Sequence, residues 1–522
     1  MIGKKDIVEI RLPFDKIEDD NFIRQKIQQK KKNLARKFFY RIIKRSIDAR
    51  QKIVYYLLRI EVSNKEIRPE DFSNLISNYP AHNKEKEVLI IGAGPAGYFA
   101  ALECLRLGLC PIVLDRGKDV RARRRDLKSI QQDDKVNPHS NYCFGEGGAG
   151  TYSDGKLYTR SHKRGKIQNV LELLVAHGAH RDILVEAHPH IGSNKLPGIV
   201  TNIRETIESN GGKVIFNCWI TDLIIEGGSL NGAVNYDGKE FRAKATILAT
   251  GHSARDIYQL LDDKKIKIEA KPFAIGVRVE HPQSLIDEAQ YNQNPRSEFL
   301  PAAAYKLVGQ VEGKGVFSFC MCPGGLIVPA ATAPGEIVVN GMSLSKRDSP
   351  YANSGVVTEI SLEDLSANGY TGTFAGVDLQ KSIEQKVFEI GDGSQKAPAQ
   401  RLLDFINGKV SVDLPKTSYI PGVYSAQISE VFPEWIHERL REGLTLFGKK
   451  MKSYLTNEAI VVATESRTSS PIKIPRDREN LMHEELKGLF PCGEGAGYAG
   501  GILSAAMDGQ NVAKAVAKFF NS

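Results

Sequence analysis

The 522-residue chain has no long apolar run and no ordered pattern of cysteines. No stretch of about eighteen apolar residues occurs, so no transmembrane helix is predicted. The first residues alternate between polar and apolar types, without the apolar core or cleavage site of a signal peptide. The seven cysteines are odd in number and scattered, which argues against a disulfide framework. These absences predict a globular protein in a reducing cytoplasm.

Metal and dithiol chemistry are poorly supported as well. Cys320-Met-Cys322 places two thiols on one face of an expected strand, but C-x-C alone does not complete a tetrahedral metal site. We therefore favour small apolar residues there over a redox or metal pair. Among the eleven histidines only His188 and His190 are close, in a proline-broken loop. No metal site is predicted.

What the sequence does contain is a complete dinucleotide-binding unit between Glu87 and Gly117. The apolar run Val88–Ile91 predicts a buried strand, and a helix is expected from about Pro95 to Leu107. The turn between them has G-x-G-x-x-G spacing and consists of Gly92, Ala93, Gly94, Pro95, Ala96 and Gly97. The first glycine permits a tight turn, the second admits a pyrophosphate and the third allows close helix–strand packing. The free amides and helix dipole then attract the anion.

An acidic residue at the end of the next strand narrows the choice of ligand. Pro111–Leu114 reads as that strand, and Asp115 follows it. A carboxylate there accepts a hydrogen bond from a ribose 2′-hydroxyl and repels a 2′-phosphate, so the ligand is FAD or NAD. The same glycine spacing recurs at 145–150 and 495–500. Neither segment follows a convincing apolar strand or has a downstream acidic strand end, so both are expected to be loops.

Later motifs distinguish FAD from NAD. A β-rich run at 213–222, the strand leading into Ala249-Thr250-Gly251, and a strand, glycine-rich loop and helix at 488–509 follow in order. This order resembles the two-dinucleotide-binding-domain flavoproteins. In that family a late acidic residue holds the ribitol of FAD, and the next helix faces the isoalloxazine and pyrophosphate. Glu494 stands where most members have Asp, which lengthens the reach by one methylene. The resemblance implies non-covalent FAD.

Four longer segments, 144–160, 249–256, 465–477 and 492–509, narrow the resemblance. Together they resemble the bacterial FAD-utilising, or NAD(FAD)-dependent, dehydrogenases, over nearly the whole chain. The family implies a flavoprotein oxidoreductase and supplies no settled substrate. Pyridine nucleotide–disulfide reductases carry a C-x4-C pair after the fingerprint, and none exists here. Cys104 and Cys110 instead straddle the end of the fingerprint helix.

The resemblance also implies the rest of the site. One arginine among Arg116, Arg121, Arg123, Arg124 and Arg125 is expected to contact the FAD phosphates. The 144–160 loop is expected under the isoalloxazine, with Ser153, Asp154 and Lys156 as polar candidates near N5. Lys156 or Arg467 would orient an anionic substrate, and no catalytic acid or base is assigned. The predicted cofactor residues are Gly92, Ala93, Gly94, Pro95, Ala96, Gly97, Asp115, Arg116, Gly117, Arg123, Gly148, Ile220, Ala249, Thr250, Gly251, Gly493, Glu494, Gly501 and Ile502.

We expect an α/β protein in four segments. Residues 86–255 and 465–522 form the two parts of a Rossmann-like FAD-binding domain of the glutathione-reductase-like type. Residues 256–464 form an inserted substrate domain, since short β-like runs between Pro/Gly turns predict a mostly antiparallel sheet. Residues 1–80 form a small α/β module, joined by a linker at 69–86.

The N-terminal module is strongly basic. From residue 24 to residue 52, twelve Lys or Arg stand against one acid, Asp48, a net charge of +11 in a chain of +9. A basic face can bind nucleic acid, an acidic lipid surface or an acidic protein. No nucleic-acid signature with stacking aromatics is evident, so a lid or docking surface beside the flavin domain is favoured.

The sequence thus predicts an FAD-dependent oxidoreductase. Hydride would pass through flavin N5 between a pyridine nucleotide or other donor and a small organic substrate. No second full dinucleotide unit exists, so NAD(P)H would bind without a Rossmann domain of its own. Two alternatives stay open, an FAD-bearing RNA-modification factor that uses residues 24–52 and a flavin-bearing, non-catalytic interaction protein. The substrate and the oligomeric state do not follow from the sequence.

Overall fold

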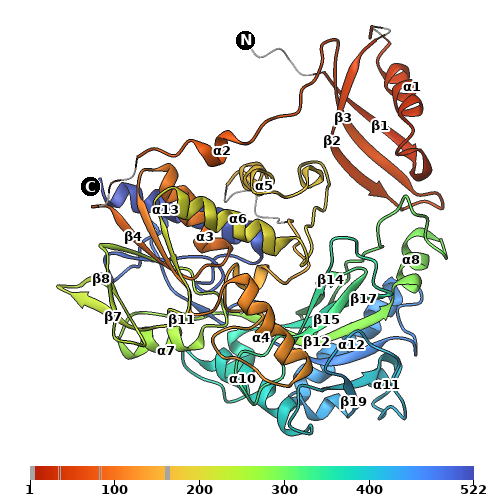
Figure 1. Cartoon of the computed structure of the whole chain (residues 1–522). Helices are drawn as coiled ribbons and strands as arrows, with labels where there is room; N and C mark the ends of the chain where they lie inside the picture. The colour runs from red at the N-terminus through yellow and green to blue at the C-terminus, as the bar shows by residue number, and fades with distance from the viewer. Residues whose placement is uncertain are drawn as a thin grey trace.

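One parallel and one mostly antiparallel β-sheet organise this mixed α/β chain, and a small three-stranded sheet stands beside them (Figure 1). The structure is a computed structural model that describes residues 6–32, 34–35, 37–81, 83, 85–158 and 165–521. Thr159 and Arg160, at the end of the predicted 144–160 motif, lie outside the described residues. Within the described ranges, no helix combines the length and apolarity that crossing a bilayer requires.

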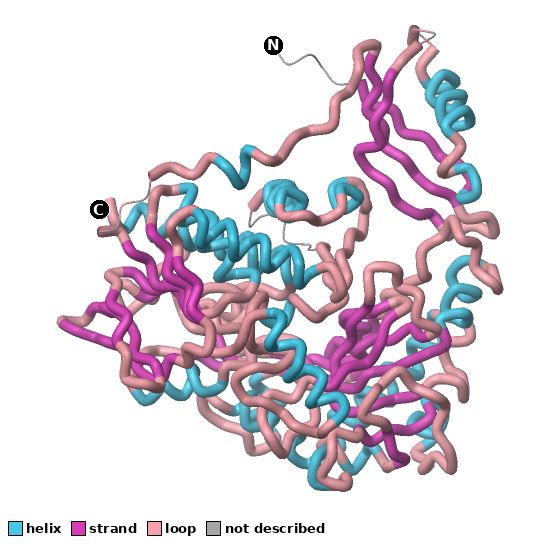
Figure 2. The backbone as a smooth tube through the Cα atoms, viewed as in Figure 1, coloured by secondary structure: helices cyan, strands magenta, loops and turns pink. Residues whose placement is uncertain are grey.

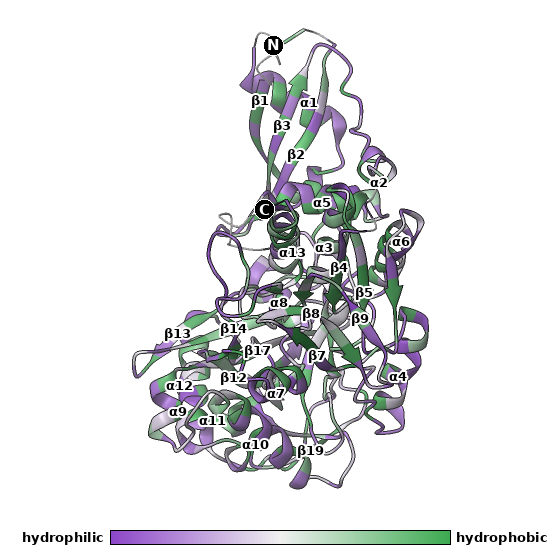
Figure 3. Cartoon of the chain, turned by 90° about the vertical axis from the view of Figure 1, so that its left-hand side faces the viewer, coloured by the Kyte–Doolittle hydropathy of each residue, from purple (hydrophilic) through white to green (hydrophobic). Residues whose placement is uncertain are grey.

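The N-terminal module is an antiparallel sheet covered on one face by a helix. Its elements are β1 (Asp6–Pro13), the short η1 (Phe14–Lys16), α1 (Asp20–Lys30), β2 (Phe39–Asp48) and β3 (Tyr55–Ser63), and the strand order is β1-β3-β2. The Asp19 side chain caps α1 by accepting the Phe22 N–H at 3.0 Å. Alternate residues of β1 are buried, and Figure 3 shows the hydrophilic and hydrophobic stripes of these strands. Three strands, a helix and the short η1 thus make up the described part of this module.

The module is held by both neighbouring parts of the chain. The Arg45 N–H donates to the Val185 carbonyl at 2.8 Å, and the Ala187 N–H donates to the Arg45 carbonyl at 2.9 Å. On another side, the Tyr56 hydroxyl donates to the Phe299 carbonyl at 2.7 Å. Its apolar core continues into that of the antiparallel sheet. The linker that follows carries the short helix α2 (Asn74–Ser77).

The parallel sheet has the order β22-β10-β4-β5-β6. Its strands are β4 (Glu87–Ile91), β5 (Cys110–Leu114), β6 (Lys213–Ile215), β10 (Ala245–Leu248) and β22 (Leu489–Pro491). Helices α3 (Pro95–Arg106), α4 (Val120–Gln132), α5 (Ile167–Ala176), α6 (Leu196–Ser209) and α13 (Ile502–Phe519) belong to this part. The predicted strand at 87–91 and the fingerprint helix are both found. The strand, glycine-rich loop and helix predicted at 488–509 are found as β22, the loop that contains 495–500, and α13.

Strand order locates the crevice where such a sheet binds its ligand. The chain runs outward from β4 to β5 and β6, then returns to the opposite side of β4 with β10 and β22. The order therefore reverses between β4 and β10. In open α/β sheets, ligands bind outside the carboxyl ends of the strands at this switch point. Gly92 and Ala249 directly follow these two strands.

The second sheet is seven-stranded, with the order β13-β14-β17-β12-β20-β18-β19. Its strands are β12 (Phe273–Pro282), β13 (Val308–Val311), β14 (Lys314–Cys322), β17 (Tyr351–Ile360), β18 (Ala397–Arg401), β19 (Val423–Ser425) and β20 (Ile460–Glu465). Only the β18–β19 pair is parallel. The predicted β-like runs coincide with β12, β14 and the hairpin β15 (Gly325–Pro329) and β16 (Val339–Ser343). The domain boundary expected at residue 465 falls on the last residue of β20.

Smaller elements complete the two large parts. The helices around the seven-stranded sheet are α8 (Gln283–Tyr291), α9 (Leu362–Ala367), α10 (Ala375–Glu389), α11 (Leu402–Asn407) and α12 (Glu434–Lys450). The remaining strands are β7 (Ile220–Glu226), β8 (Ser229–Asn235) and β9 (Glu240–Arg242) in one sheet, and β11 (Glu269–Ala270) with β21 (Ile472–Lys473) in another. Helix α7 (Arg255–Asp263) packs beside β7 in the apolar cluster of the parallel sheet. Figure 2 shows loops gathered between the two large sheets.

Candidate cofactor-binding site

The turn after β4 brings two strand ends into direct contact. Gly92 has φ +111°, and a Cβ built on it would lie 2.3 Å from the carbonyl oxygen of Ala249. No other residue type fits this position, because both the backbone conformation and the space exclude a side chain. The fingerprint and the Ala249-Thr250-Gly251 segment, distant in sequence, therefore adjoin at the switch point.

Gly94, unlike Gly92, has room for a side chain. Its backbone is extended, with φ −75°, so no conformational strain demands glycine. A Cβ built on it would meet only the Cα of Gly148, at 3.9 Å. A side-chain methyl at Gly94 would therefore overlap no protein atom, and the motif would place a pyrophosphate beside this position.

Two helix N-termini point at this space. Neither α3 nor α13 has a side-chain cap, so their first backbone N–H groups are available to an anion. The short helix η2 (Gly148–Gly150) lies between them. A Cβ built on Gly150 would lie 3.2 Å from Ile502 Cγ1 and 3.3 Å from Pro95 Cγ. The predicted residues Gly94, Pro95, Gly148, Gly501 and Ile502 therefore gather around one cradle that suits a diphosphate.

Asp115 occupies the strand end as expected. Its carboxylate accepts the Ala93 N–H and the Gly117 N–H, each at 2.8 Å. A carboxylate offers about four acceptor positions, so others are left for ribose hydroxyls. Asp115 thereby joins the fingerprint turn to the chain that follows β5. Its placement fits the adenosine ribose of a dinucleotide.

Arg123 is a correction to the predicted site. It is fully buried, and its five N–H groups donate to the carbonyls of Asn141, Tyr142, Gly145, Glu146 and Gly148 at 2.8 to 3.2 Å. Because an arginine has only five N–H donors, none is left for a phosphate. Arg123 instead supports the 141–148 loop, including Gly148 of the cradle. Arg116 pairs with Asp256 at 2.8 Å and lies over the Phe144 ring.

The late glycine loop meets the second strand end. A Cβ built on Gly495 would lie 2.5 Å from the Gly251 carbonyl oxygen. The Glu494 carboxylate accepts the Gly501 N–H at the start of α13 and lies 3.7 Å from His252 Nε2. Burial lowers the pKa of His252, although Glu494 opposes the shift, so the imidazole is neutral at pH 7. Glu494 thus borders the cradle.

Two carboxylates that the sequence analysis left unassigned organise the site. Asp508 of α13 accepts the Gly493 N–H at 2.8 Å and pairs with Arg476 at 2.6 Å. Glu146, fully buried, accepts the Val120 N–H and pairs with Arg204, each at 2.8 Å. An acid within an apolar helix face was the available signal for Asp508. For Glu146 no comparable signal existed.

Asp154, one of the predicted polar candidates, is buried at the centre of a charged cluster that also includes the partly exposed Lys156. Asp154 receives hydrogen bonds from Ser343 and from Arg347, the latter at 2.6 Å, and lies 3.8 Å from Lys156 Nζ. Burial alone would raise the pKa of Asp154, but Lys156 and Arg347 outweigh it and hold the pKa below its ordinary value. Lys156 also donates to the Met321 carbonyl of β14. This cluster joins the loop after η2 to the seven-stranded sheet.

Arg467 is also more constrained than expected. It pairs with Glu384 at 2.8 Å and Glu336 at 3.0 Å, and Arg255 pairs with the same two carboxylates. Arg467 is 5% exposed. Both of its charge partners are internal, so it stabilises this junction and does not bind a substrate anion. Of the two predicted substrate-orienting cations, only Lys156 keeps appreciable exposure.

Ile220 and Gly117, two of the other predicted residues, pack within the protein. Ile220 begins β7 in an apolar cluster, and Gly117 packs against Gly145. Cys320 and Cys322 are free thiols on β14. Among the described residues, no three His, Cys, Asp or Glu side chains gather as a metal site.

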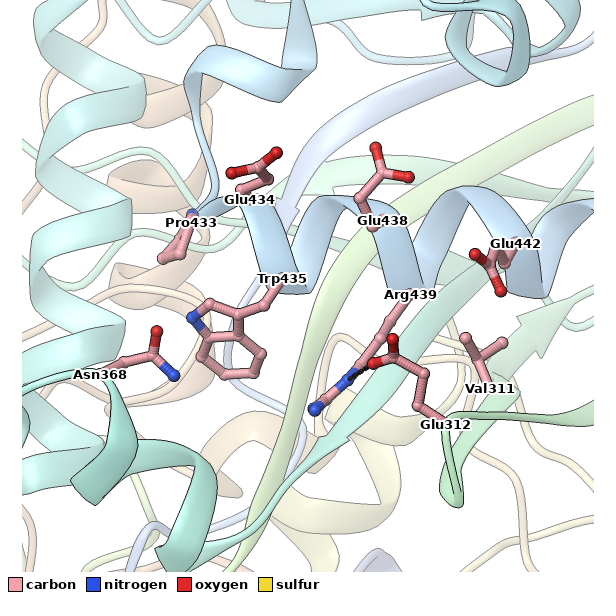
Figure 4. A pocket seen from close by; sticks show the side chains of 9 residues that line it. All are labelled: Val311, Glu312, Asn368, Pro433, Glu434, Trp435, Glu438, Arg439 and Glu442. Atoms are coloured by element: carbon pink, nitrogen blue, oxygen red, sulfur yellow. Dashed lines mark ion pairs between the residues drawn. The ribbon is translucent and has the colours of Figure 1, made fainter.

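A separate pocket of about 520 Å³ lies beside α12 (Figure 4). Its lining includes Glu312, Glu434, Glu438 and Glu442, and its arginine, Arg439, pairs with Asp364 at 2.9 Å. None of the predicted cofactor residues lines it. The acidic lining would repel a pyrophosphate, so this pocket is distinct from the dinucleotide cradle.

Sequence comparisons cover almost the entire chain. Residues 272–468 match the family model "FAD-dependent protein, C-terminal domain-like", and residues 4–63 match a domain of unknown function, DUF8436. An uncharacterised protein of Clostridium beijerinckii is 40% identical over 525 residues, with 97% of each chain covered.

Solved structures of flavoproteins are similar at a greater distance. A triple mutant of the flavin-dependent brominase Bmp2 is 13% identical, with 83% of this chain and 80% of that chain covered and a TM-score of 0.35. CtdE in complex with FAD is 13% identical, with 84% and 90% covered and a TM-score of 0.31. A flavoprotein/dehydrogenase from Cytophaga hutchinsonii is 11% identical, with 83% and 79% covered and a TM-score of 0.34. These similarities are too remote to assign an activity.

Proposed function

We propose that the chain, which belongs to one family with the uncharacterised clostridial protein, is an FAD-dependent oxidoreductase acting on a small organic substrate, and the family match over residues 272–468 supports this. FAD would be bound non-covalently, and a pyridine nucleotide or another donor would supply hydride. The observation that carries the proposal is the cradle at Gly94, where the N-termini of α3 and α13 carry no side-chain cap and a Cβ on Gly94 would meet no protein atom closer than 3.9 Å.

Each part of the cradle has a role toward the dinucleotide. The first amides of α3 and α13 would donate to the pyrophosphate, and the aligned helix dipoles add positive potential there. Asp115 would accept hydrogen bonds from the adenosine ribose. Glu494, with one oxygen on the Gly501 N–H, would reach the ribitol with the other. The chain thereby binds and orients the cofactor along the carboxyl edge of the parallel sheet.

When bound, FAD supplies two-electron chemistry at the flavin ring. The chain's contribution there is orientation and exclusion of water. Lys156 joins the loop after η2 to β14 by donating to the Met321 carbonyl, so the seven-stranded sheet would form the far wall of the substrate space. Lys156, 35% exposed at its side chain, is the cation that would orient an anionic substrate.

The test is anaerobic reduction of the FAD-loaded chain. We would follow flavin absorbance during titration with NADH, NADPH and a panel of reduced metabolites, with dithionite as the control that the flavin is reducible. At least one biological donor should bleach the flavin, and an added acceptor should restore it. If only dithionite reduced the flavin, the oxidoreductase proposal would be wrong.

A further inference from the structure

The basic residues of the N-terminal module divide into paired and unpaired sets. Several arginines are neutralised by carboxylates: Arg24 by Asp20 at 2.6 Å, Arg41 by Glu61 at 2.6 Å, and Arg50 by Asp48 at 2.8 Å. Arg45 and Lys31 also pair with acids. The broad basic face expected from the sequence is therefore reduced. Among the described residues from β1 to β3, the lysines that no acid pairs with are Lys44 on β2, Lys52 between β2 and β3, and a group on and after α1.

Four lysines at the end of α1 have no acidic partner among the residues that the structure describes. Lys26 and Lys30 lie one turn apart on the helix, and Lys32 and Lys37 follow it in the chain. Lys30, Lys32 and Lys37 are exposed, whereas Lys26 is half-buried with its ammonium 5.4 Å from the Phe22 ring. We call these four residues the lysine patch. A single cation would satisfy the C-terminal end of the α1 dipole, so the number of lysines is not explained by helix stability.

The surroundings of the patch favour a hydrophilic polyanion. Exposed neighbours on α1 are amides, Gln25, Gln28 and Gln29, which can donate to phosphate oxygens. The apolar side chains of this helix, Ile23 and Ile27, are 3% and 0% exposed against the sheet. An amphipathic helix that inserts into a membrane surface needs an exposed apolar face, and Ile23 and Ile27 of α1 are both buried.

The position of the patch leaves room for a polymer. The module projects from the two large sheets, and α1 lies on its outer side (Figure 1). The contacts with the rest of the chain use Arg45 of β2 and Tyr56 of β3, not α1. The patch is thus accessible while the module stays docked.

We propose that the lysine patch binds the phosphodiester backbone of nucleic acid without sequence preference. Lysine contacts with phosphates release counterions, and this electrostatic contribution alone supports non-specific binding. Sequence readout is not part of the proposal, because base recognition needs additional contacts with base edges. The inference does not depend on bound FAD, so a failure of the flavin proposal would leave it testable.

The test is fluorescence anisotropy with the full chain. Labelled single-stranded RNA and DNA of about 20 nucleotides and of identical sequence serve as separate probes, at increasing KCl. The variant K26Q/K30Q/K32Q/K37Q removes the patch. The matched control K381Q/K386Q/K409Q/K416Q removes four exposed lysines elsewhere and has the same net charge. K30Q/K32Q, which changes two exposed side chains, provides a milder form should the quadruple variant not fold.

Wild type should bind at low salt, with log Kd changing by roughly 3 per log unit of salt for four phosphate contacts on a single strand. The patch variant should lose at least about tenfold in affinity at low salt, and the control less than about twofold. Comparable binding of RNA and DNA would show a backbone contact, and a preference for RNA would assign the site to RNA. Absence of low-salt binding, or equal loss in the patch and control variants, would overturn the proposal. So would patch-dependent binding to phosphatidylserine vesicles without nucleic-acid binding.

Discussion

At the scale of single residues, residues of the same type have different roles in the structure. Gly92 is required by its left-handed backbone and by the Ala249 carbonyl 2.3 Å from a built Cβ. Gly94 has neither constraint, and its missing side chain matters only to a ligand. The charged residues divide in the same way. Arg123 donates all its hydrogen bonds to carbonyls of the protein, and Arg467 pairs with internal carboxylates. The side chain of Lys156, in contrast, is 35% exposed.

The two glycines give a matched pair of variants. Gly94→Ala should leave the unfolding free energy of the apoprotein within about 0.5 kcal/mol, because the new methyl meets nothing closer than 3.9 Å. It should weaken FAD binding by at least about tenfold, since the methyl occupies the cradle. Gly92→Ala should destabilise the apoprotein by about 3 kcal/mol or more through strain and overlap. Denaturant unfolding and FAD titration measure both, and wild-type FAD affinity of Gly94→Ala would refute the assignment.

Glu384 has a predicted contribution to stability. Removing its charge by Glu384→Gln leaves the buried Arg467 and Arg255 with Glu336 alone, and should cost about 3 kcal/mol of unfolding free energy. Glu434→Gln on the surface of α12 should change stability by less than about 0.5 kcal/mol. Burial opposes ionisation, but Arg467 and Arg255 hold the pKa of Glu384 at about 2, against an ordinary 4.5. Its contribution is therefore complete above pH 4.5 and is lost as the pH falls toward 2. If the difference in unfolding free energy between wild type and Glu384→Gln did not change between pH 4.5 and pH 2, this prediction would be wrong.

At the scale of elements, the predictable features were those with local causes. The strand Glu87–Ile91, the turn and α3 follow from a short apolar run, three glycines and Pro95 at the first helical position. The β-like runs of the second sheet were also visible as alternation. The partners of residues that lie far apart in the sequence were not predictable. The carbonyls that take up Arg123 and the carboxylates that hold Arg467 depend on tertiary packing, which composition and spacing do not encode.

The 141–148 loop should depend on Arg123. Arg123→Lys keeps the charge but replaces five fixed donors with three, so at least two buried carbonyls lose their partner. The expected cost is about 3 kcal/mol of unfolding free energy. Arg121→Lys, at an exposed position of the same helix, should change it by less than about 0.5 kcal/mol. Equal stability of the two variants would show that the loop does not need the arginine.

At the scale of the whole molecule, three parts of the chain contact one another. The parallel sheet supplies the strand ends, the seven-stranded sheet is joined to the loop after η2 through Lys156, and the N-terminal module docks on both parts. A lid or docking role for the module agrees with this position. The nucleic-acid proposal uses a different face of the same module.

The docking of the N-terminal module can be tested by exchanging the charges of one ion pair. Arg45 and Glu186 pair beside the backbone bonds that join β2 to residues 185–187, with side chains 26% and 35% exposed. Arg45→Glu and Glu186→Arg should each cost about 1 kcal/mol, and the double variant should recover about half of the summed loss. Unfolding measurements on the three variants give the coupling energy. Strict additivity would mean that the pair does not contribute to docking.

The central claim is that this chain is an FAD protein, and cofactor content tests it most directly. The purified chain, supplied with FAD and freed of excess, should show flavin absorbance and release one unmodified FAD per chain on denaturation, while Gly94→Ala should retain far less. A correctly folded chain that stays colourless and takes up no FAD would contradict the account.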